Sequence, residues 1–373
     1  MNDVLNRATF QYSRLTAGEQ IDLASYVITT GRLGAINGTY VTKLEQEVAD
    51  RIGRSQAIGV ASATAGLQIA LRALGACPGK HVIIPALGWV SVGTAATATG
   101  AEVTIAPITQ DLALDWEGIK PLLHTETCAV VLAHMRGMPA PDTVRMAAEL
   151  GKRGIPLIED CAQAWGVTVA DRPAGAYGTA AVLSTQTHKL IATGEGGLVL
   201  TDDLELATTM RALAGDTRTP TPAPVWRGNA RMSEITAALA LPQLQHLDHL
   251  VERLQPLQRR VATLLRKLPG VQAVLPDTQR AATTNGTHAG AWYATAERAE
   301  HDARLLIAAG VRCWHPYDGD LHTAEAWPVR LPSKRSRPQP DLRRYLDIQI
   351  PCLQSANHDL FCDLIAQAVG ERP

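Results

Sequence analysis

Short apolar runs alternate with helix-forming segments through the first two hundred residues of the chain. The runs are typical of buried strands and lie at residues 57–61, 81–85, 102–105, 129–133, 156–158 and 180–183. Segments with helical character, such as 65–74 and 143–153, lie between them. Strands that alternate with helices at this pitch predict a largely parallel sheet with helices on both faces. We therefore predict an α/β fold.

The rest of the chain predicts a second, smaller domain. Residues 235–268 have the pattern of one long helical stretch, with a break or kink at Pro242 and another near Pro256. Further strands are expected at 289–294, 311–314 and 346–350, and helices at 296–309 and 357–369. A chain of 373 residues also exceeds the size at which single cores stop growing. We expect an N-terminal arm and large domain over 1–250 and a small α+β domain over 251–373.

Charge and cysteine usage exclude several classes of protein. Lys and Arg number 35 against 36 Asp and Glu, so no basic surface for nucleic acid or an anionic membrane is expected. The six cysteines lack CxxC pairs and Cys/His ligand spacing, which favours reduced thiols in a cytoplasmic protein without a metal site. We find no apolar run of membrane-spanning length and no signal-peptide pattern. The expected partner is a small molecule.

Lys189 is the first candidate for chemistry. It follows the apolar run 180–183 and precedes the glycine-rich turn 194–197, which leads into another apolar run at 198–200. A lysine beside a packed sheet is partly desolvated, which lowers its pKa and makes its amine able to form a Schiff base near neutral pH. An isolated surface lysine beside a tight turn would have the same pattern, so both interpretations stay open.

Three other segments follow predicted strands. Asp160 and Trp89 come after the runs 156–158 and 81–85, at the strand ends where open α/β sheets bind ligands. Asp160 could instead cap a following helix, and Trp89 could belong to the core. Residues 62–64 form a small-residue loop before a helix, which is either a phosphate site or an ordinary N-cap.

Together these segments resemble the DegT/DnrJ/EryC1/StrS family of aminotransferases that use pyridoxal 5'-phosphate. The resemblance covers residues 25–370 and is carried by ordered motifs at 62–64, 89, 134–137, 159–164, 184–189, 194–197 and 228–232. It implies the fold-type I aspartate-aminotransferase architecture and a homodimer with shared active sites. It also implies transfer of an amino group from glutamate or glutamine to a keto-sugar, keto-cyclitol or related ketone, in natural-product or amino-sugar biosynthesis.

The resemblance assigns roles to individual residues. Lys189 would hold the cofactor aldehyde as a Schiff base and move a proton during the reaction. Asp160 would pair with the pyridine nitrogen and keep it protonated. The remaining cofactor contacts would be Gln163 near the phenolic oxygen, Trp89 on the ring face, and Ala63, Thr64, Ser184 and the partner subunit's Asn229 around the phosphate.

The chain departs from the family pattern at Arg136, where an aromatic or aliphatic residue is usual. Arg136 either faces the substrate and recognises a carboxylate or phosphate, or is a surface arginine on a loop. His188, Trp226 and Arg227 are further candidate substrate contacts, and we expect the last two to enter the neighbouring subunit's pocket.

Four other functions compete with transamination. A dehydratase of the same family would carry histidine at the Schiff-base position, whereas Lys189 is present here with His188 before it. A cyclising or aromatising enzyme with the same cofactor stays open. A non-catalytic sensor predicts a damaged site, but the lysine, aspartate, glutamine, serine and asparagine are all present. A nucleotide-binding oxidoreductase is disfavoured because no GxGxxG motif follows a strand.

Overall fold

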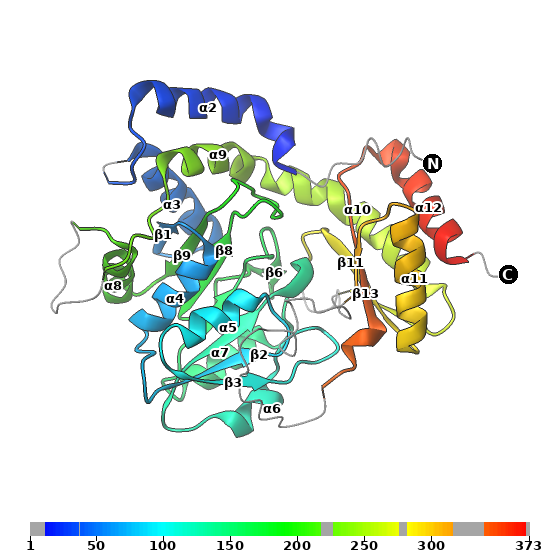
Figure 1. The fold of residues 1–373 in the computed structure, drawn as a ribbon, viewed down its shortest axis with the longest axis horizontal. Helices are drawn as coiled ribbons and strands as arrows, with labels where there is room; N and C mark the ends of the chain where they lie inside the picture. Colours follow the sequence, from blue (N-terminus) through cyan, green and yellow to red (C-terminus); the bar gives the residue numbers. More distant parts are fainter. Residues whose placement is uncertain (1–11, 37, 218–226, 276–281, 316–338, 371–373) are drawn as a thin grey trace.

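A computed structural model describes residues 12–36, 38–217, 227–275, 282–315 and 339–370. Figure 1 shows a large part built on one sheet and a smaller part beside it, with the helix α10 (Leu247–Arg266) running from one to the other. Trp226, one of the predicted substrate contacts, lies outside the described residues.

The large sheet has seven strands in the order β1-β9-β8-β5-β4-β2-β3. The strands are β1 (Gln56–Val60), β2 (His81–Pro85), β3 (Glu102–Ala106), β4 (Thr127–Ala133), β5 (Leu157–Asp160), β8 (Ala180–Ser184) and β9 (Gly197–Thr201). Strand β9 is antiparallel to both of its neighbours, β1 and β8, and the other four strand pairs of this sheet are parallel. The predicted α/β class and its largely parallel sheet are therefore confirmed.

Helices cover both faces of this sheet because successive strand residues point to opposite sides. In β4, Val131 packs with α4 (Ala63–Ala73), α5 (Val90–Thr97) and α8 (Leu204–Ala214). Its neighbours Val130 and Leu132 pack instead with α6 (Trp116–Ile119) and α7 (Thr143–Gly151). The other face is also covered by α3 (Thr39–Ile52), whose apolar residues at helical spacing are buried.

The long helical stretch after residue 233 is divided in a different place from the one predicted. It forms α9 (Glu234–Gln245) and α10, which are separated at His246, whereas Pro242 and Pro256 both lie inside helices. A proline removes one backbone hydrogen bond, and α10 tolerates this loss because it buries a continuous row of leucines and valines. The helix α2 (Ala17–Thr30) packs against α9.

The small part is an antiparallel sheet in the order β10-β11-β13-β12. Its strands are β10 (Val271–Val274), β11 (His288–Tyr293), β12 (Cys313–Trp314) and β13 (Tyr345–Gln349). The sheet packs with α10 and α11 (Ala296–Ala308), and α12 (His358–Gly370) packs with these two helices. The expected domain boundary at residue 250 falls inside α10, and it stays a prediction. In the described ranges, no helix combines the length and the apolar character needed to cross a bilayer.

Candidate active site

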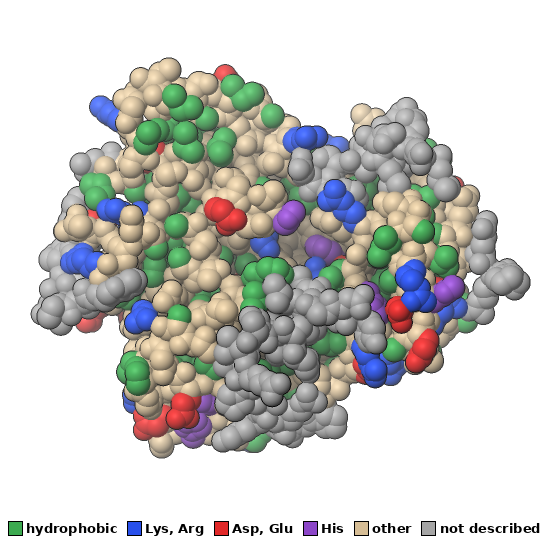
Figure 2. All heavy atoms as spheres, viewed as in Figure 1, with side chains coloured by type: hydrophobic (Ala, Val, Ile, Leu, Met, Phe, Trp, Pro, Cys, Tyr) green, Lys and Arg blue, Asp and Glu red, His purple; other side chains and the backbone are tan. Residues whose placement is uncertain are grey.

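A cavity of about 660 Å³ lies at the ends of β4, β5 and β8 and extends to the first residues of the small sheet. Figure 2 shows a hollow near the centre of this face, with basic and histidine side chains in and beside it. The cavity brings together many of the residues that the sequence singled out: Ala63, Thr64, Trp89, Arg136, Asp160, Gln163, Ser184, His188 and Lys189. Residues from separate strand ends therefore meet in one place.

The first turn of α4 forms one wall of the cavity. Ser62 caps this helix, and its Oγ accepts a hydrogen bond of 3.1 Å from the Ala65 amide. The amides of Ala63 and Thr64 come first in the helix, where backbone N–H groups have no intrahelical partner. Gly197 lets β9 approach this turn, because a Cβ there would lie 2.7 Å from the Ala63 nitrogen. The resulting helix terminus is suited to an anion such as a phosphate.

Lys189 sits in the loop between β8 and β9, half-buried at the cavity wall. The loop is tied by backbone hydrogen bonds from Thr185 N to Gly196 O (3.0 Å) and from Lys189 N to Gln186 O (2.9 Å). Burial lowers the pKa of Lys189 to about 8, against the opposing effect of Asp160 and with a further lowering from the positive charge of Arg136. The amine is therefore partly neutral, and so nucleophilic, close to neutral pH.

Asp160 is the last residue of β5 and is 7% exposed. Its Oδ1 accepts a hydrogen bond of 3.0 Å from the Ala162 amide. Burial raises the pKa of Asp160, although this amide, Lys189 and His134 act in the opposite direction. A buried carboxylate of this kind is stabilised as an anion by a cation placed beside it.

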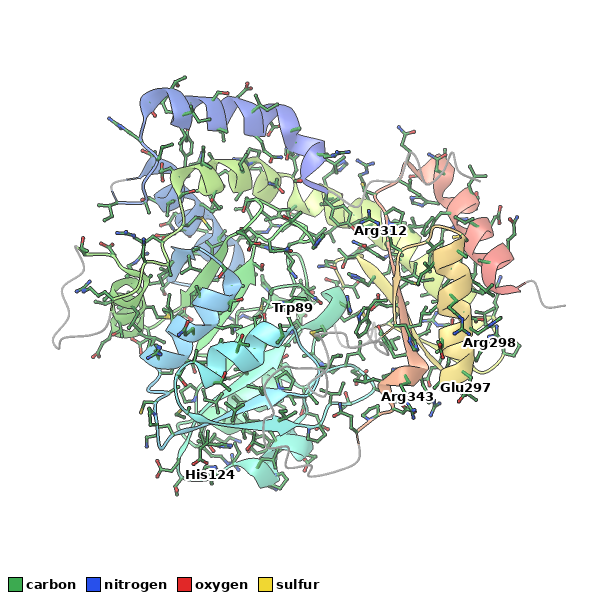
Figure 3. All side chains as sticks on the ribbon, in the orientation of Figure 1. Trp89, His124, Glu297, Arg298, Arg312 and Arg343 are labelled. Atoms are coloured by element: carbon green, nitrogen blue, oxygen red, sulfur yellow. The ribbon has the colours of Figure 1, made fainter. Side chains whose placement is uncertain are left out.

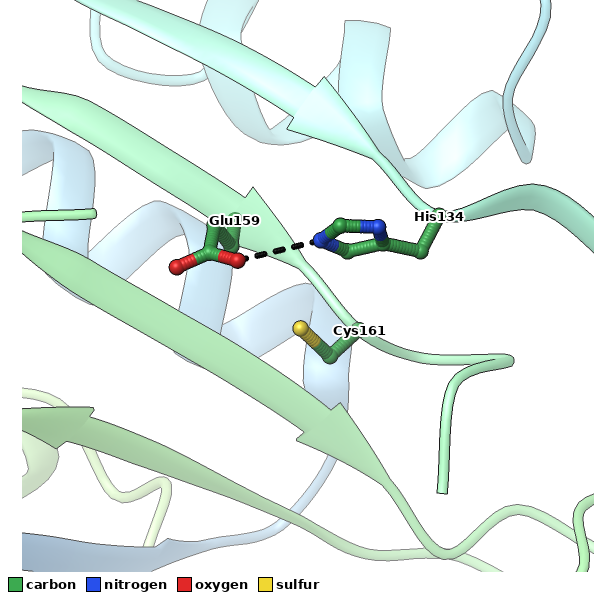
Figure 4. Close-up of side chains that lie close together, drawn as sticks. All are labelled: His134, Glu159 and Cys161. Atoms are coloured by element: carbon green, nitrogen blue, oxygen red, sulfur yellow. Dashed lines mark hydrogen bonds and ion pairs between the residues drawn. The ribbon is translucent and has the colours of Figure 1, made fainter. Parts of the chain in front are cut away.

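Glu159, the residue before Asp160, is fully buried beneath the cavity. Its carboxylate accepts hydrogen bonds from the amides of Gly175 (2.9 Å), Tyr177 (2.7 Å) and Gly178 (2.6 Å) and from His134 Nε2 (3.0 Å; Figure 4). Burial alone would raise the pKa of Glu159, but these hydrogen bonds outweigh it and lower the pKa. Glu159 is therefore a buried anion that joins the ends of β4 and β5.

His134, Glu159 and Cys161 lie close enough to suggest a metal site, with one candidate ligand atom from each within 4.8 Å of the others (Figure 4). The hydrogen bonds argue against metal binding. His134 Nδ1 accepts the Ala140 amide, so the ring carries its proton on Nε2 and donates it to Glu159. Burial raises the pKa of Cys161 well above its ordinary value, which keeps it a thiol.

Trp89 and Gln163 also line the cavity. Trp89 precedes α5 and is 46% exposed, so the interpretation of this residue as core is wrong; Figure 3 shows it near the junction with the small sheet. Gln163 lines the cavity, and its Oε1 accepts a hydrogen bond of 2.7 Å from the Arg136 amide. An aromatic face is therefore available to a ligand in the cavity.

Arg136 is not a surface arginine, because it is only 7% exposed. Its Nε lies 3.1 Å from Asp347 Oδ2 on β13, and its guanidinium carbon lies 3.9 Å from the centroid of the Trp314 ring on β12. The surface interpretation is therefore wrong. Arg136 is held between the large sheet and the small one, and it lines the cavity.

Two candidates from the segment before α9 lie outside the lining that the described residues give this cavity. Asn229 is exposed, and its Oδ1 accepts a hydrogen bond of 3.0 Å from Arg231 Nη2. The Arg227 Nη1 donates to the Asp216 carbonyl at 2.6 Å. His188 does line the cavity, but its side chain is exposed.

Several polar residues of the cavity were not found by sequence reasoning: Tyr12, Asn285, Thr287, His288 and Gln349. Most come from the N-terminal segment or from the small sheet, far from the motifs in the chain. Tyr12 is buried because its hydroxyl donates to the Ile350 carbonyl at 2.6 Å, a contact between residues 338 positions apart. No local pattern marks such residues.

Comparison with known proteins now identifies the family. The model of the DegT/DnrJ/EryC1/StrS aminotransferase family matches residues 17–334. The chain belongs to this family. The predicted recognition, the fold-type I architecture and the aminotransferase activity are thereby confirmed.

Two curated members of the DegT/DnrJ/EryC1/StrS family are similar to this chain over most of its length. The L-glutamine:2-deoxy-scyllo-inosose aminotransferase of Micromonospora echinospora is 34% identical over 304 residues, which cover 76% of this chain and 70% of the relative. The L-glutamine:scyllo-inosose aminotransferase of Streptomyces griseus is 32% identical over 350 residues, which cover 86% and 80%. Among solved structures, S. venezuelae DesV in complex with a ketimine intermediate is 26% identical with a TM-score of 0.83, covering 98% of this chain and all of that one.

Proposed function

We propose that this aminotransferase takes an amino group from glutamine and delivers it to a keto-cyclitol, with pyridoxal 5'-phosphate as its cofactor. The observation that carries the proposal is the placement of Lys189, with its lowered pKa, and the buried Asp160 in one cavity beside a helix N-terminus. The donor and acceptor follow from the two relatives, which are named as glutamine-dependent inosose aminotransferases.

The cavity residues fit the cofactor at both of its ends. The amides of Ala63 and Thr64 at the start of α4, with the buried Ser184 hydroxyl, would hold the dianionic phosphate. Asp160 would hold the pyridine nitrogen in its protonated form, because a cation there is the charge that the buried carboxylate needs. This match of charges at two ends of one cavity supports a phosphorylated pyridine.

The middle of the cofactor would lie between Trp89 and Gln163. The exposed face of Trp89 offers a stacking surface, and the Gln163 side chain supplies an amide near the ring substituents. The cofactor itself supplies an aldehyde and an electron-accepting ring. Lys189 would attach covalently through its amine and, once displaced by substrate, carry a proton to and from the reacting carbon.

The proposed acceptor is a polyhydroxylated ring, and the cavity wall is rich in groups that bind hydroxyls. Asn285, Thr287, His288 and Gln349 enter from the small sheet, and Gln186 from the loop before Lys189. Such side chains donate and accept hydrogen bonds without a net charge when the histidine is neutral. A neutral cyclitol suits this wall. His188 and Arg227 remain candidate substrate contacts.

We also propose that the enzyme is a cytoplasmic homodimer whose sites are shared. The exposed Asn229 does not reach the cavity of its own chain, in line with a phosphate contact made by the partner subunit's Asn229. Large apolar side chains are exposed on and beside α2 (Figure 2), among them Ile21 (64%), Tyr26 (59%) and Ile28 (60%). Exposed apolar side chains gathered on one element favour burial against another chain.

Spectroscopy and product analysis test the reaction. Purified enzyme loaded with pyridoxal 5'-phosphate is expected to show a visible absorbance band that bleaches with glutamine and returns when scyllo-inosose or 2-deoxy-scyllo-inosose is added. Lys189→Ala should abolish turnover, whereas Lys152→Ala, at an exposed lysine directly after α7, should not. If glutamine and glutamate both leave the band unchanged, or if no keto-cyclitol in a panel with keto-sugars restores it, the proposed reaction is wrong.

Subunit mixing tests the shared site. In a mixed dimer, the defects of Lys189→Ala and Asn229→Ala fall together in one site only if Asn229 acts across the interface. One of the two sites then has neither defect, so mixing two nearly inactive variants should restore activity. A mixture no more active than its components would show that each site is built from a single chain.

A further inference from the structure

Arg136 combines burial with a strained, fixed position at the cavity. It lies in the single turn Met135–Gly137 after β4, with a left-handed backbone at φ 58° and ψ 29°. A residue with a Cβ adopts this conformation at a cost, so surrounding contacts must hold it there. The Gln163 side chain does so by accepting the Arg136 amide at 2.7 Å.

The guanidinium is held by two residues of the small sheet. Asp347 is 1% exposed and approaches Nε at 3.1 Å, and the Trp314 ring lies under the guanidinium plane at 3.9 Å. An arginine gripped between a carboxylate and an aromatic face loses little further freedom when it binds a ligand. The side chain is therefore preorganised.

Much of the hydrogen-bonding capacity of Arg136 is unused. Arginine carries five N–H donors; among the residues that the structure describes, Nη2 has no hydrogen-bond partner and Nε meets only the ion-pair contact with Asp347. Buried charged groups normally have their donors satisfied. The unused donors of a residue that lines the cavity point to a ligand with paired acceptor oxygens.

The positive charge of Arg136 lies close enough to affect the Lys189 amine. Arg136 is one of the causes that lower the pKa of Lys189, so the guanidinium lies within electrostatic reach of that amine. An amino acid carries a carboxylate one bond from the carbon that bears its amine. A keto-cyclitol carries none. Of the two proposed substrates, only the amino donor can therefore satisfy Arg136.

We propose that Arg136 binds the carboxylate of the amino donor and so determines donor recognition, an inference that rests on the proposed function. Asp347 and Trp314 position the guanidinium, and Gln163 fixes the backbone that carries it. The acceptor ketone binds the same cavity through its hydroxyls and does not depend on Arg136.

The two half-reactions of the loaded enzyme can be followed separately by the visible absorbance band. Arg136→Gln should raise the glutamine concentration needed for half-maximal bleaching by about tenfold or more, the loss expected for one charged contact. The return of the band with the keto-cyclitol should keep its concentration dependence. Arg145→Gln, at an exposed arginine on α7, is the matched control and should change neither half-reaction.

Calorimetry with glutarate gives a readout that is independent of turnover, because glutarate has two carboxylates and no amine. Wild-type holoenzyme should bind it, and Arg136→Gln should weaken that binding about tenfold or more. Asp347→Asn removes the neutralising carboxylate and leaves the cation, so it should keep or strengthen glutarate binding. If Arg136 served only to join the large sheet to the small one through Asp347, both variants should lose glutarate binding to the same extent.

Three outcomes would overturn the proposal: equal loss in both half-reactions, selective loss in the ketone half-reaction, or weaker glutarate binding in Asp347→Asn. If Arg136→Gln does not fold, Arg136→Lys keeps the charge without the planar fork, and undiminished glutarate binding by it would also refute bidentate recognition. Failure of glutamine to bleach the wild-type band would refute the proposed donor, whereas the glutarate comparison would still test Arg136.

Discussion

Replacement of Glu159 by glutamine tests how the floor of the site is built. In the carboxylate, Oε1 accepts the Tyr177 and Gly178 amides, and Oε2 accepts the Gly175 amide and His134 Nε2. Glutamine keeps one acceptor oxygen and places an NH₂ group where the other oxygen was. The two N–H groups that donated to that oxygen then face another donor. Two hydrogen bonds to a charged group are therefore lost.

The magnitude follows from these contacts. Hydrogen bonds to charged groups contribute about 1.5–3 kcal/mol each, so two of them amount to about 3–6 kcal/mol. Removal of a buried charge recovers part of its desolvation cost. We therefore expect Glu159→Gln to lower the free energy of unfolding by about 3 kcal/mol. Glu126→Gln, at an exposed partner of Lys80, should change it by less than about 1 kcal/mol.

Urea unfolding of the cofactor-free proteins, followed by tryptophan fluorescence at one fixed protein concentration, measures both effects. The pKa of Glu159 is lowered in the folded state, so its contribution is complete above the unfolded-state value of about 4.3 and is lost as the pH falls through the lower folded-state value. The difference between wild type and Glu159→Gln should shrink over that range. A loss below about 1 kcal/mol at pH 7, or a difference that does not change with pH, would refute the reasoning.

Three further predictions concern other parts of the structure. Glu234→Ala should destabilise the fold by about 2–4 kcal/mol in the same assay, because this buried carboxylate accepts three amides of the first turn of α3; a change under about 1 kcal/mol would contradict the cap. Gly197→Ala should destabilise by about 1–3 kcal/mol and weaken cofactor binding, because its Cβ would crowd Ala63; unchanged affinity in a fluorescence titration would contradict this. The rate at which cofactor-free enzyme recombines with pyridoxal 5'-phosphate should rise as Lys189 loses its proton near pH 8, and a midpoint near pH 10 would contradict the lowered pKa.

Local pattern accounts for most of the fold. The bounds of β2 agree with those predicted, because this strand is a bounded apolar run. The strand β10 was missed because its four residues are half-buried or exposed and give no apolar run. The break at His246 was misplaced because a proline is only one of the ways in which a helix can end.

The site was predictable where residues follow strands and unpredictable where it depends on distant contacts. Asp160 and Lys189 were found because the ends of β5 and β8 lie side by side in the sheet. The pairing of Arg136 with Asp347 joins residues from the two sheets, and nothing near either residue in the sequence indicates the other. Glu234 likewise reaches α3 across nearly two hundred positions.

The adjacent carboxylates Glu159 and Asp160 show how one strand supplies both a structural residue and a functional residue of the site. Successive residues of β5 point to opposite faces, so Glu159 enters the packed floor while Asp160 enters the cavity. Three amides and His134 stabilise the anion of Glu159 and lower its pKa, whereas burial raises the pKa of Asp160. Environments that separate two neighbouring carboxyl groups in this way distinguish a structural anion from a functional one. Asp160 is therefore the carboxylate that still requires a cation, and a protonated pyridine beside it would supply one.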